Sequence, residues 1–134
     1  MTSLAHGVDL VPVARIEQMI SDHGDRFLER VFTTGERAQA ERVVRGRGER
    51  YAARFAAKEA VLKALGTGLS GGITWQDIDV KRTSAGAPFV EFSGVAAEKA
   101  SSLGLNTWRL TLSHAGGLAI ASVVASGQVN SETC

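Results

Sequence analysis

Cysteine is nearly absent from this chain of 134 residues, and its single cysteine is the last residue, Cys134. One thiol cannot form an intrachain disulfide, and the sequence has no cluster of cysteine and histidine that would bind structural zinc. Charge of one sign is not in excess either, since the formal net charge is +1. Such a chain has no general attraction to nucleic acid or to an anionic membrane surface.

Long hydrophobic runs are also missing. The longest one near the C-terminus, residues 118–125, is far shorter than the roughly 20 residues that a membrane-spanning helix requires. The first residues, MTSLAHGVD, lack the basic segment and the apolar core of a secretory signal. Because nothing indicates export or an oxidising compartment, we expect a cytoplasmic protein that binds neither membranes nor nucleic acid.

The residues that are present suit one globular domain. Hydrophobic residues make up 44% and charged residues 22% of the chain, which are ordinary proportions. A chain of this length buries about two-thirds of its unfolded surface, which is enough for an independent core. No internal repeat is visible, and we expect one domain over residues 1–126 and a polar, disordered tail over 127–134.

Hydrophobic periodicity and turn residues predict an α+β fold, with a small antiparallel sheet packed against one long helix and several shorter helices. Antiparallel pairing is expected because consecutive strands are joined by short turns. Thr33 or Thr34 caps one helix, and Glu36 completes a capping box if the cap is Thr33. The expected strands are 5–11, 73–81, 89–92, 108–112 and 118–124, and the expected helices are one that begins at Pro12, then 27–32, 33–44, 49–65 and 94–103, with turns at 84–88 and 113–117.

The most informative segment is 54–68, RFAAKEAVLKALGTG. With about 100° between successive residues of a helix, Glu59 and Lys63 share one side, whereas Arg54 and Lys58 lie on another. No continuous polar face remains, so we expect the helix to be covered on several sides and its charged groups to have partners. These partners are either side chains, as in a Glu59–Lys63 pair that contributes roughly 0.2–0.5 kcal/mol, or a ligand.

Five blocks of sequence resemble the holo-acyl-carrier-protein synthase family, the short single-domain phosphopantetheinyl transferases. The resemblance covers residues 4–126, in the same order and spacing as in the family. It implies the phosphopantetheinyl transferase fold and a homotrimer with its active sites between subunits. The blocks are Gly7-Val8-Asp9 followed by Arg15-Ile16, Phe32-Thr33 with Glu36, RFAAKEA, GTG, and Leu112-Ser113-His114.

The activity that the resemblance implies is Mg²⁺-dependent transfer of phosphopantetheine from coenzyme A to a serine of an apo acyl carrier protein, with release of adenosine 3′,5′-bisphosphate. Such a reaction supports fatty acid biosynthesis. Phosphoryl transfer depends mainly on alignment and on neutralising the phosphate charges. A catalytically idle coenzyme A-binding module of the same fold and a purely structural trimer are the alternatives, and the presence of Asp9, Glu59 and Lys63 favours the transferase.

Asp9 and Glu59 are the metal ligands that the resemblance implies, and Lys63 completes the implied catalytic group. Without the resemblance, three interpretations of Asp9 in its apolar strand are open. The carboxylate is exposed at the strand end, or it pairs with Arg15, or it binds a metal ion. Two carboxylates leave most positions of Mg²⁺ to water and phosphate oxygens, and Mn²⁺ is a possible substitute. Lys63 would hold the leaving phosphate. The serine proton goes to one of the carboxylates or, as we prefer, to a metal-activated water.

The resemblance places further residues beside coenzyme A, each with a structural alternative. Guanidinium groups suit phosphate, although loop arginines also suit solvent and helical bases also suit ion pairs. The glycines that follow the long helix either let the backbone approach the cofactor or simply cap the helix. The residues so implied are Arg45, Arg47, Arg54, Lys58, Lys63, Gly66, Gly68, Ser113 and His114.

The implied partner is an acidic acyl carrier protein, or a carrier domain, that meets a basic first helix. Arg15, Met19 and Arg26 match this pattern, whereas Asp22 and Asp25 depart from it and put in doubt which carrier is preferred. A mixed-charge helix that one small domain would not easily cover is consistent with burial at a subunit interface of the implied trimer.

Overall fold

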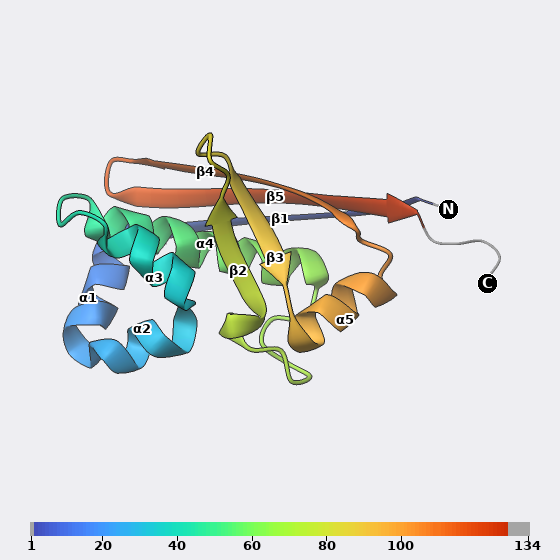
Figure 1. The fold of residues 1–134 in the computed structure, drawn as a ribbon, viewed down its shortest axis with the longest axis horizontal. Helices are drawn as coiled ribbons and strands as arrows, with labels where there is room; N and C mark the ends of the chain where they lie inside the picture. Colours follow the sequence, from blue (N-terminus) through green and yellow to red (C-terminus); the bar gives the residue numbers. More distant parts are fainter. Residues whose placement is uncertain (1, 129–134) are drawn as a thin grey trace.

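The computed structural model describes residues 2–128 as a layer of three long strands over a central helix, with shorter helices and a two-stranded sheet around that helix (Figure 1). This is the α+β architecture expected from the sequence. Within residues 2–128, no helix is both long enough and apolar enough to span a membrane. The elements are β1 (Thr2–Pro12), α1 (Val13–His23), α2 (Asp25–Val31), α3 (Thr34–Glu41), α4 (Arg47–Leu65), the 3₁₀ turn η1 (Trp75–Asp77), β2 (Ile78–Arg82), β3 (Pro88–Phe92), α5 (Gly94–Ser102), β4 (Thr107–Ala115) and β5 (Leu118–Gln128).

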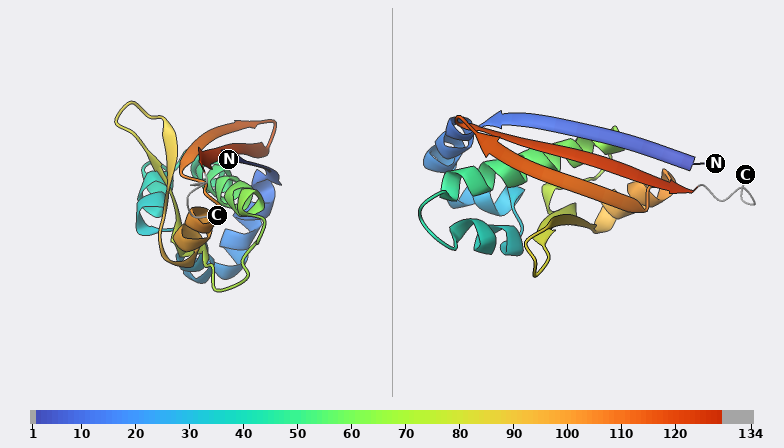
Figure 2. Two further views of the ribbon diagram at one scale, coloured as in Figure 1. Left: turned by 90° about the vertical axis from the view of Figure 1, so that its right-hand side faces the viewer. Right: turned by 90° about the horizontal axis from the view of Figure 1, so that it is seen from above.

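All strand pairs are antiparallel, as predicted. The larger sheet has the order β1-β5-β4, and its three strands run side by side over α4 (Figure 2). Strands β2 and β3 form a separate two-stranded sheet. Side chains alternate along β5, because successive residues of a strand point to opposite faces. Those facing α4 are small and fully buried, namely Ala119, Ala121, Val123 and Ala125.

Helix α4 is the centre of the core. The three-stranded sheet covers one side of it, and α1, α3 and β2 contact its other sides. The prediction that this helix is covered on several sides is therefore confirmed. Most of this cover comes from the chain itself, so the burial of α4 does not require a second subunit.

Strand β1 lies in direct contact with α4 where Gly7 meets Ala60. A Cβ atom on Gly7 would overlap the carbonyl oxygen of Ala60 and would lie 3.0 Å from the backbone nitrogen of Ala64. Only glycine permits this separation of strand and helix, since every other residue carries a Cβ. Asp9, two residues further along β1, points to the same face of the strand.

The ends of several elements differ from the prediction for local reasons. Thr33 is the cap of α3, with the capping box complete, because the Glu36 N–H donates to Thr33 Oγ1 at 3.1 Å and the Thr33 N–H donates to Glu36 Oε1 at 2.9 Å. That helix ends at Glu41, three residues before the predicted end. Strand β2 begins only at Ile78, because Asp77 caps the preceding 3₁₀ turn at Thr74.

The hairpin between β4 and β5 is tighter than predicted. Its turn is only Gly116 and Gly117, with φ of 58° and 79°, the left-handed conformation that a two-residue hairpin turn requires. Ser113 and His114 are therefore strand residues and not turn residues. At its other end β5 includes positions 127 and 128, which the sequence analysis assigns to the tail. Residues 129–134 of the predicted tail lie outside the described residues.

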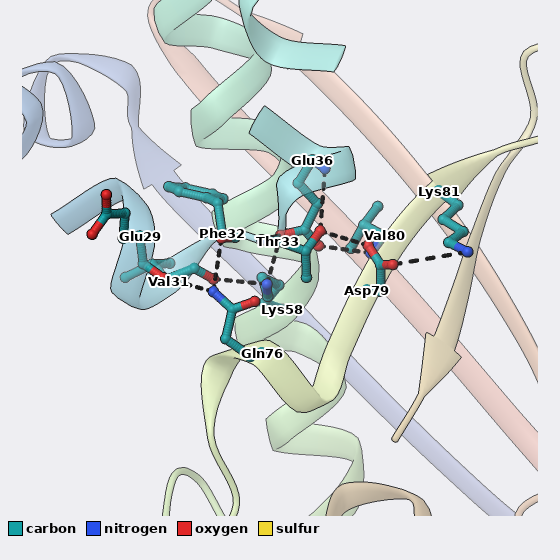
Figure 3. Close-up of polar contacts among 10 residues, drawn as sticks. All are labelled: Glu29, Val31, Phe32, Thr33, Glu36, Lys58, Gln76, Asp79, Val80 and Lys81. Carbon is teal, nitrogen blue, oxygen red and sulfur yellow. Dashed lines mark hydrogen bonds and ion pairs between the residues drawn. The ribbon is translucent and has the colours of Figure 1, made fainter. Parts of the chain in front are cut away.

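A buried ion pair joins α4 to its neighbours (Figure 3). Lys58 Nζ donates to Glu36 Oε1 at 2.6 Å and to the carbonyl oxygen of Val31 at 2.7 Å, while Glu36 Oε2 accepts from the Val80 N–H at 2.7 Å. Both charged side chains are fully buried. Burial raises the pKa of Glu36 and lowers the pKa of Lys58, and the contact between the two groups opposes both shifts. The expectation that Lys58 contacts a cofactor is thus corrected, because its ammonium group is enclosed among α2, α3 and β2.

We predict that Lys58→Met and Glu36→Gln each lower the free energy of unfolding by about 3–5 kcal/mol, because each leaves the other charge buried without its partner. The double variant should cost clearly less than the sum of the two. Urea unfolding followed by circular dichroism measures all three values. Lys81→Met is the matched control, since Lys81 pairs with Glu91 on the surface, where a pair is worth roughly 0–1 kcal/mol. A Lys58→Met value as small as that of the control would contradict the prediction.

Candidate functional site

Asp9 and Lys63 meet where β1 lies on α4. Lys63 Nζ donates to Asp9 Oδ1 at 3.1 Å and to the carbonyl oxygen of Val8 at 2.9 Å. The Asp9 side chain is 17% exposed and that of Lys63 is 54% exposed, so the pair sits at the surface end of the contact between strand and helix. The sequence left open whether Asp9 pairs with Arg15 or lies free at a strand end, and the structure pairs it with Lys63.

Glu59 is the second carboxylate of this site. Partial burial raises its pKa, the negative charge of Asp9 raises it further, and the positive charges of Lys63 and Arg15 oppose the shift. The two carboxylates are therefore close enough to repel one another. Among the residues that the structure describes, Glu59 and Lys63 do not form the ion pair that their spacing allowed. Lys63 pairs with Asp9 of β1 instead.

The donor set fits a hard divalent cation that has further ligands. Asp9 and Glu59 offer carboxylate oxygens, the ligands that Mg²⁺ prefers. Within residues 2–128, no group of three or more acidic, histidine or cysteine side chains is placed to hold a metal ion. Two carboxylates suit Mg²⁺, which commonly keeps several waters and takes phosphate oxygens of a substrate as ligands.

A second polar site is a cavity of about 630 Å³ between the N-terminal half of α4, the end of β4 and the loop after α3. Arginines dominate its lining although the whole chain is almost neutral. Such a concentration of guanidinium groups suits a ligand with several phosphates. The polar side chains that line it are Arg42, Arg45, Glu49, Arg50, Arg54, Arg82, Ser113 and His114.

Arg54 is the most constrained of these arginines. Its side chain is nearly buried, with 2% of the residue exposed, and its Nη1 donates to the carbonyl oxygen of Arg50 at 3.1 Å. Its buried Nε has no hydrogen-bond partner among residues 2–128. Burial, and then the positive charges of Arg82, Arg42 and Arg50, lower the pKa of Arg54 to about 10. A bound anion would relieve the repulsion among these cations.

His114 lies at the rim of this arginine-lined cavity and is held by Glu49. The two side chains approach to 2.6 Å between His114 Nδ1 and Glu49 Oε2. A carboxylate on Nδ1 fixes the ring orientation and leaves Nε2 available for another partner. Arg50 also anchors the loop between α3 and α4. Its guanidinium group donates to the carbonyl oxygens of Ala40 and Arg45 at 2.9 and 2.8 Å.

The structure does not place all predicted cofactor residues here. Arg47 donates to Glu41 at 2.5 Å and lies over the Tyr51 ring, outside the lining of the arginine cavity. Gly66 is the C-cap of α4 in the left-handed conformation, and its N–H donates to Leu62 and Lys63 carbonyl oxygens. Arg42, Arg50, Arg82 and Glu49 were missed by the sequence analysis. Only Arg50 could have been found from the sequence. It lies four residues before Arg54 in a predicted helix, and residues four apart share one side of a helix.

The two polar sites lie on opposite sides of α4. Arg54 and Lys63 are nine residues apart, which corresponds to a rotation of about 180° and a rise of about 13.5 Å along the helix. The carboxylates and the arginine cavity of one chain therefore face away from each other.

A second cavity, of about 590 Å³, is lined by residues of α1, α2 and α4 together with Leu69 and Trp75. It brings together the three residues predicted to bind a carrier, namely Arg15, Met19 and Arg26. The lining combines basic side chains with apolar ones, which include Phe27 and Trp75. Arg15, which lines this cavity, also lowers the pKa of Glu59 through its positive charge.

Comparison with known proteins gives a consistent match. The family model described as 4′-phosphopantetheinyl transferase superfamily matches residues 5–121. The chain is 46% identical to the holo-[acyl-carrier-protein] synthase of Koribacter versatilis, over 90% of this chain and 96% of the relative. It is 48% identical to that of Chloroflexus aggregans, over 91% and 94%.

Solved structures of similar proteins share the fold. The holo-[acyl-carrier-protein] synthase of Helicobacter pylori in complex with coenzyme A has a TM-score of 0.78 and 31% identity, over 90% of this chain and 98% of that one. The one from Bacillus anthracis in complex with coenzyme A (3′,5′-ADP) has a TM-score of 0.77 and 32% identity, over 96% and 100%.

We predict that Glu59→Gln stabilises the metal-free protein at neutral pH. The raised pKa of Glu59 means that the folded state holds this proton more readily than the unfolded chain does, so stability falls as pH rises through the two pKa values. Glutamine removes that loss, and the melting temperature at pH 7 in EDTA should rise by roughly 1–4 °C. The gain should shrink towards pH 4. Thermal unfolding at both pH values tests this, with the exposed Glu91→Gln as control, and a lower melting temperature at pH 7 would refute it.

Proposed function

Because this chain belongs to the 4′-phosphopantetheinyl transferase superfamily, we propose that it is a holo-[acyl-carrier-protein] synthase. It transfers the phosphopantetheine moiety of coenzyme A to a serine hydroxyl of apo acyl carrier protein and releases adenosine 3′,5′-bisphosphate. The observation that carries the proposal is the presence, in one chain, of a paired-carboxylate site and an arginine cavity that together suit a diphosphate and its nucleotide.

Asp9 and Glu59 are the proposed ligands of Mg²⁺. Their mutual repulsion and their oxygen chemistry fit a divalent cation. Bound there, Mg²⁺ supplies charge neutralisation for the two phosphates of coenzyme A. Mn²⁺ has the same preference for oxygen ligands and is a possible replacement.

Lys63 is the proposed contact of the leaving phosphate. In the reaction, the serine hydroxyl loses its proton to a carboxylate of the site or to a water molecule, and its oxygen forms a bond to the phosphorus that bears the pantetheine arm. The bond from this phosphorus to the bridging oxygen of the diphosphate breaks. Negative charge grows on the departing nucleotide phosphate. An ammonium group on a flexible, half-exposed side chain beside the carboxylates can follow that charge.

The nucleotide end of coenzyme A is proposed to bind in the arginine cavity. Arg45, Arg54, Ser113 and His114 line it, and guanidinium groups suit the 3′-phosphate. Glu49 holds His114 at the rim, which supports His114 as a phosphate contact and not as a nucleophile. Gly66 and Gly68, which follow α4, are proposed to allow the backbone to approach the cofactor.

Self-association as a homotrimer is proposed because one chain cannot apply both polar sites to one diphosphate. The sites lie on opposite sides of α4, so the arginine cavity of a second copy has to complete the carboxylate site. The sheet face turned away from α4 supports such contact, since it carries exposed apolar side chains along two neighbouring strands. These are Leu4, Val8, Leu10, Leu118, Ile120 and Val124.

The proposed partner is an acyl carrier protein, or a carrier domain, with an acidic surface. The cavity beside α1 offers Arg15 and Arg26 to acidic groups, and Met19 with its aromatic neighbours to an apolar side chain. Its position next to Glu59 would deliver the acceptor serine to the reacting phosphate. A role in fatty acid biosynthesis and a cytoplasmic location follow from this activity as further proposals.

The test is intact-protein mass spectrometry of an apo acyl carrier protein after incubation with this protein, coenzyme A and Mg²⁺. We expect a mass gain equal to one phosphopantetheine, lost on addition of EDTA and reduced by at least about a hundredfold in Asp9→Asn and Glu59→Gln. Glu91→Gln, an exposed carboxylate on β3, serves as control and should retain activity. If several carriers gain no mass although coenzyme A binds, the catalytically idle module is the better description.

A further inference from the structure

In the structure, Lys63 neutralises the carboxylate to which a metal would bind. Its Nζ lies 3.1 Å from Asp9 Oδ1 and 2.9 Å from the Val8 carbonyl oxygen, so two acceptors of β1 hold it in place. The same ammonium group also offsets the repulsion between Asp9 and Glu59. The negative charge of Asp9 is thus balanced by a cation that belongs to the protein.

A divalent cation and this ammonium group cannot share Asp9 without cost. Mg²⁺ binds carboxylate oxygens at about 2.0–2.1 Å, so an ion on Asp9 Oδ1 would lie within about 5 Å of Lys63 Nζ as that group is now placed. Like charges at such a separation repel, and more strongly at a partly buried site than in water. Lys63 is 54% exposed on a long flexible stem, so it can leave Asp9 easily if it gains another partner.

We propose that Lys63 is a placeholder cation, which occupies Asp9 in the resting protein and moves to the diphosphate when coenzyme A binds. This inference rests on the proposed function. It makes Lys63 a competitor of the metal before coenzyme A arrives and a ligand of the phosphates afterwards. Metal and coenzyme A then strengthen each other's binding, and the two effects are equal by linkage.

The experiment is a titration of the full-length protein with Mn²⁺, followed by electron paramagnetic resonance, without and with coenzyme A. Lys63→Met should bind Mn²⁺ roughly three to ten times more tightly than wild type in the absence of coenzyme A. Coenzyme A should strengthen Mn²⁺ binding to wild type by a larger factor than binding to Lys63→Met. The variant should still be slower in transfer, because it lacks the phosphate contact.

Lys81→Met is the matched control. Lys81 is also a half-exposed lysine in a surface ion pair, with Glu91 at 2.8 Å, and its loss changes the net charge by the same amount. Its Mn²⁺ affinity should stay within about twofold of wild type, because distant surface charges are screened by salt. Equal Mn²⁺ affinities for Lys63→Met and Lys81→Met would overturn the placeholder role.

Asp9→Asn separates this inference from the proposed metal site. If Asp9→Asn weakens Mn²⁺ binding and Lys63→Met does not strengthen it, the metal site stands and the placeholder role is wrong. If Asp9→Asn leaves Mn²⁺ binding unchanged, the metal assignment itself is wrong, and the placeholder role falls with it. Weaker binding by Asp9→Asn together with tighter binding by Lys63→Met supports both.

Discussion

The contact between β1 and α4 at Gly7 is the constraint on which the rest of the structure depends. Without a Cβ at this position, the strand backbone lies directly on the helix at Ala60. That short separation brings Asp9 of β1 beside Glu59 and Lys63 of α4, although these residues are about fifty positions apart in the chain. The paired carboxylates are thus a product of strand and helix packing, and not of either element alone.

Helix α4 distributes its charged residues over three environments. Lys58 is fixed in a buried pair with Glu36, which links the helix to α2, α3 and β2 and so sets the direction in which its other side chains point. Glu59 and Lys63 then face β1, while Arg54 faces the arginine cavity. A single 19-residue helix in this way carries charged residues of two polar sites and one structural anchor.

The local chemistry of the chain was predictable, whereas the partners of its charged groups were not. The capping box of Thr33 and Glu36 and the antiparallel α+β order follow from short-range patterns. Lys58 was misassigned because periodicity gives the side of a helix but not what covers that side. The arginine cavity was only partly foreseen, since Arg42 and Arg82 reach it from separate elements through tertiary packing.

Completion of the active site by a second copy is the central claim about function, and subunit complementation tests it most directly. Glu59→Gln would be co-expressed with the double variant Arg45→Ala and His114→Ala, and the mixed assembly purified through two different tags. Each variant alone should be inactive, and the purified mixed trimers should show about a third of the wild-type transfer rate, because in a ring of three that contains both variants one interface in three combines two intact halves. A mixed assembly as inactive as its parents would contradict the account.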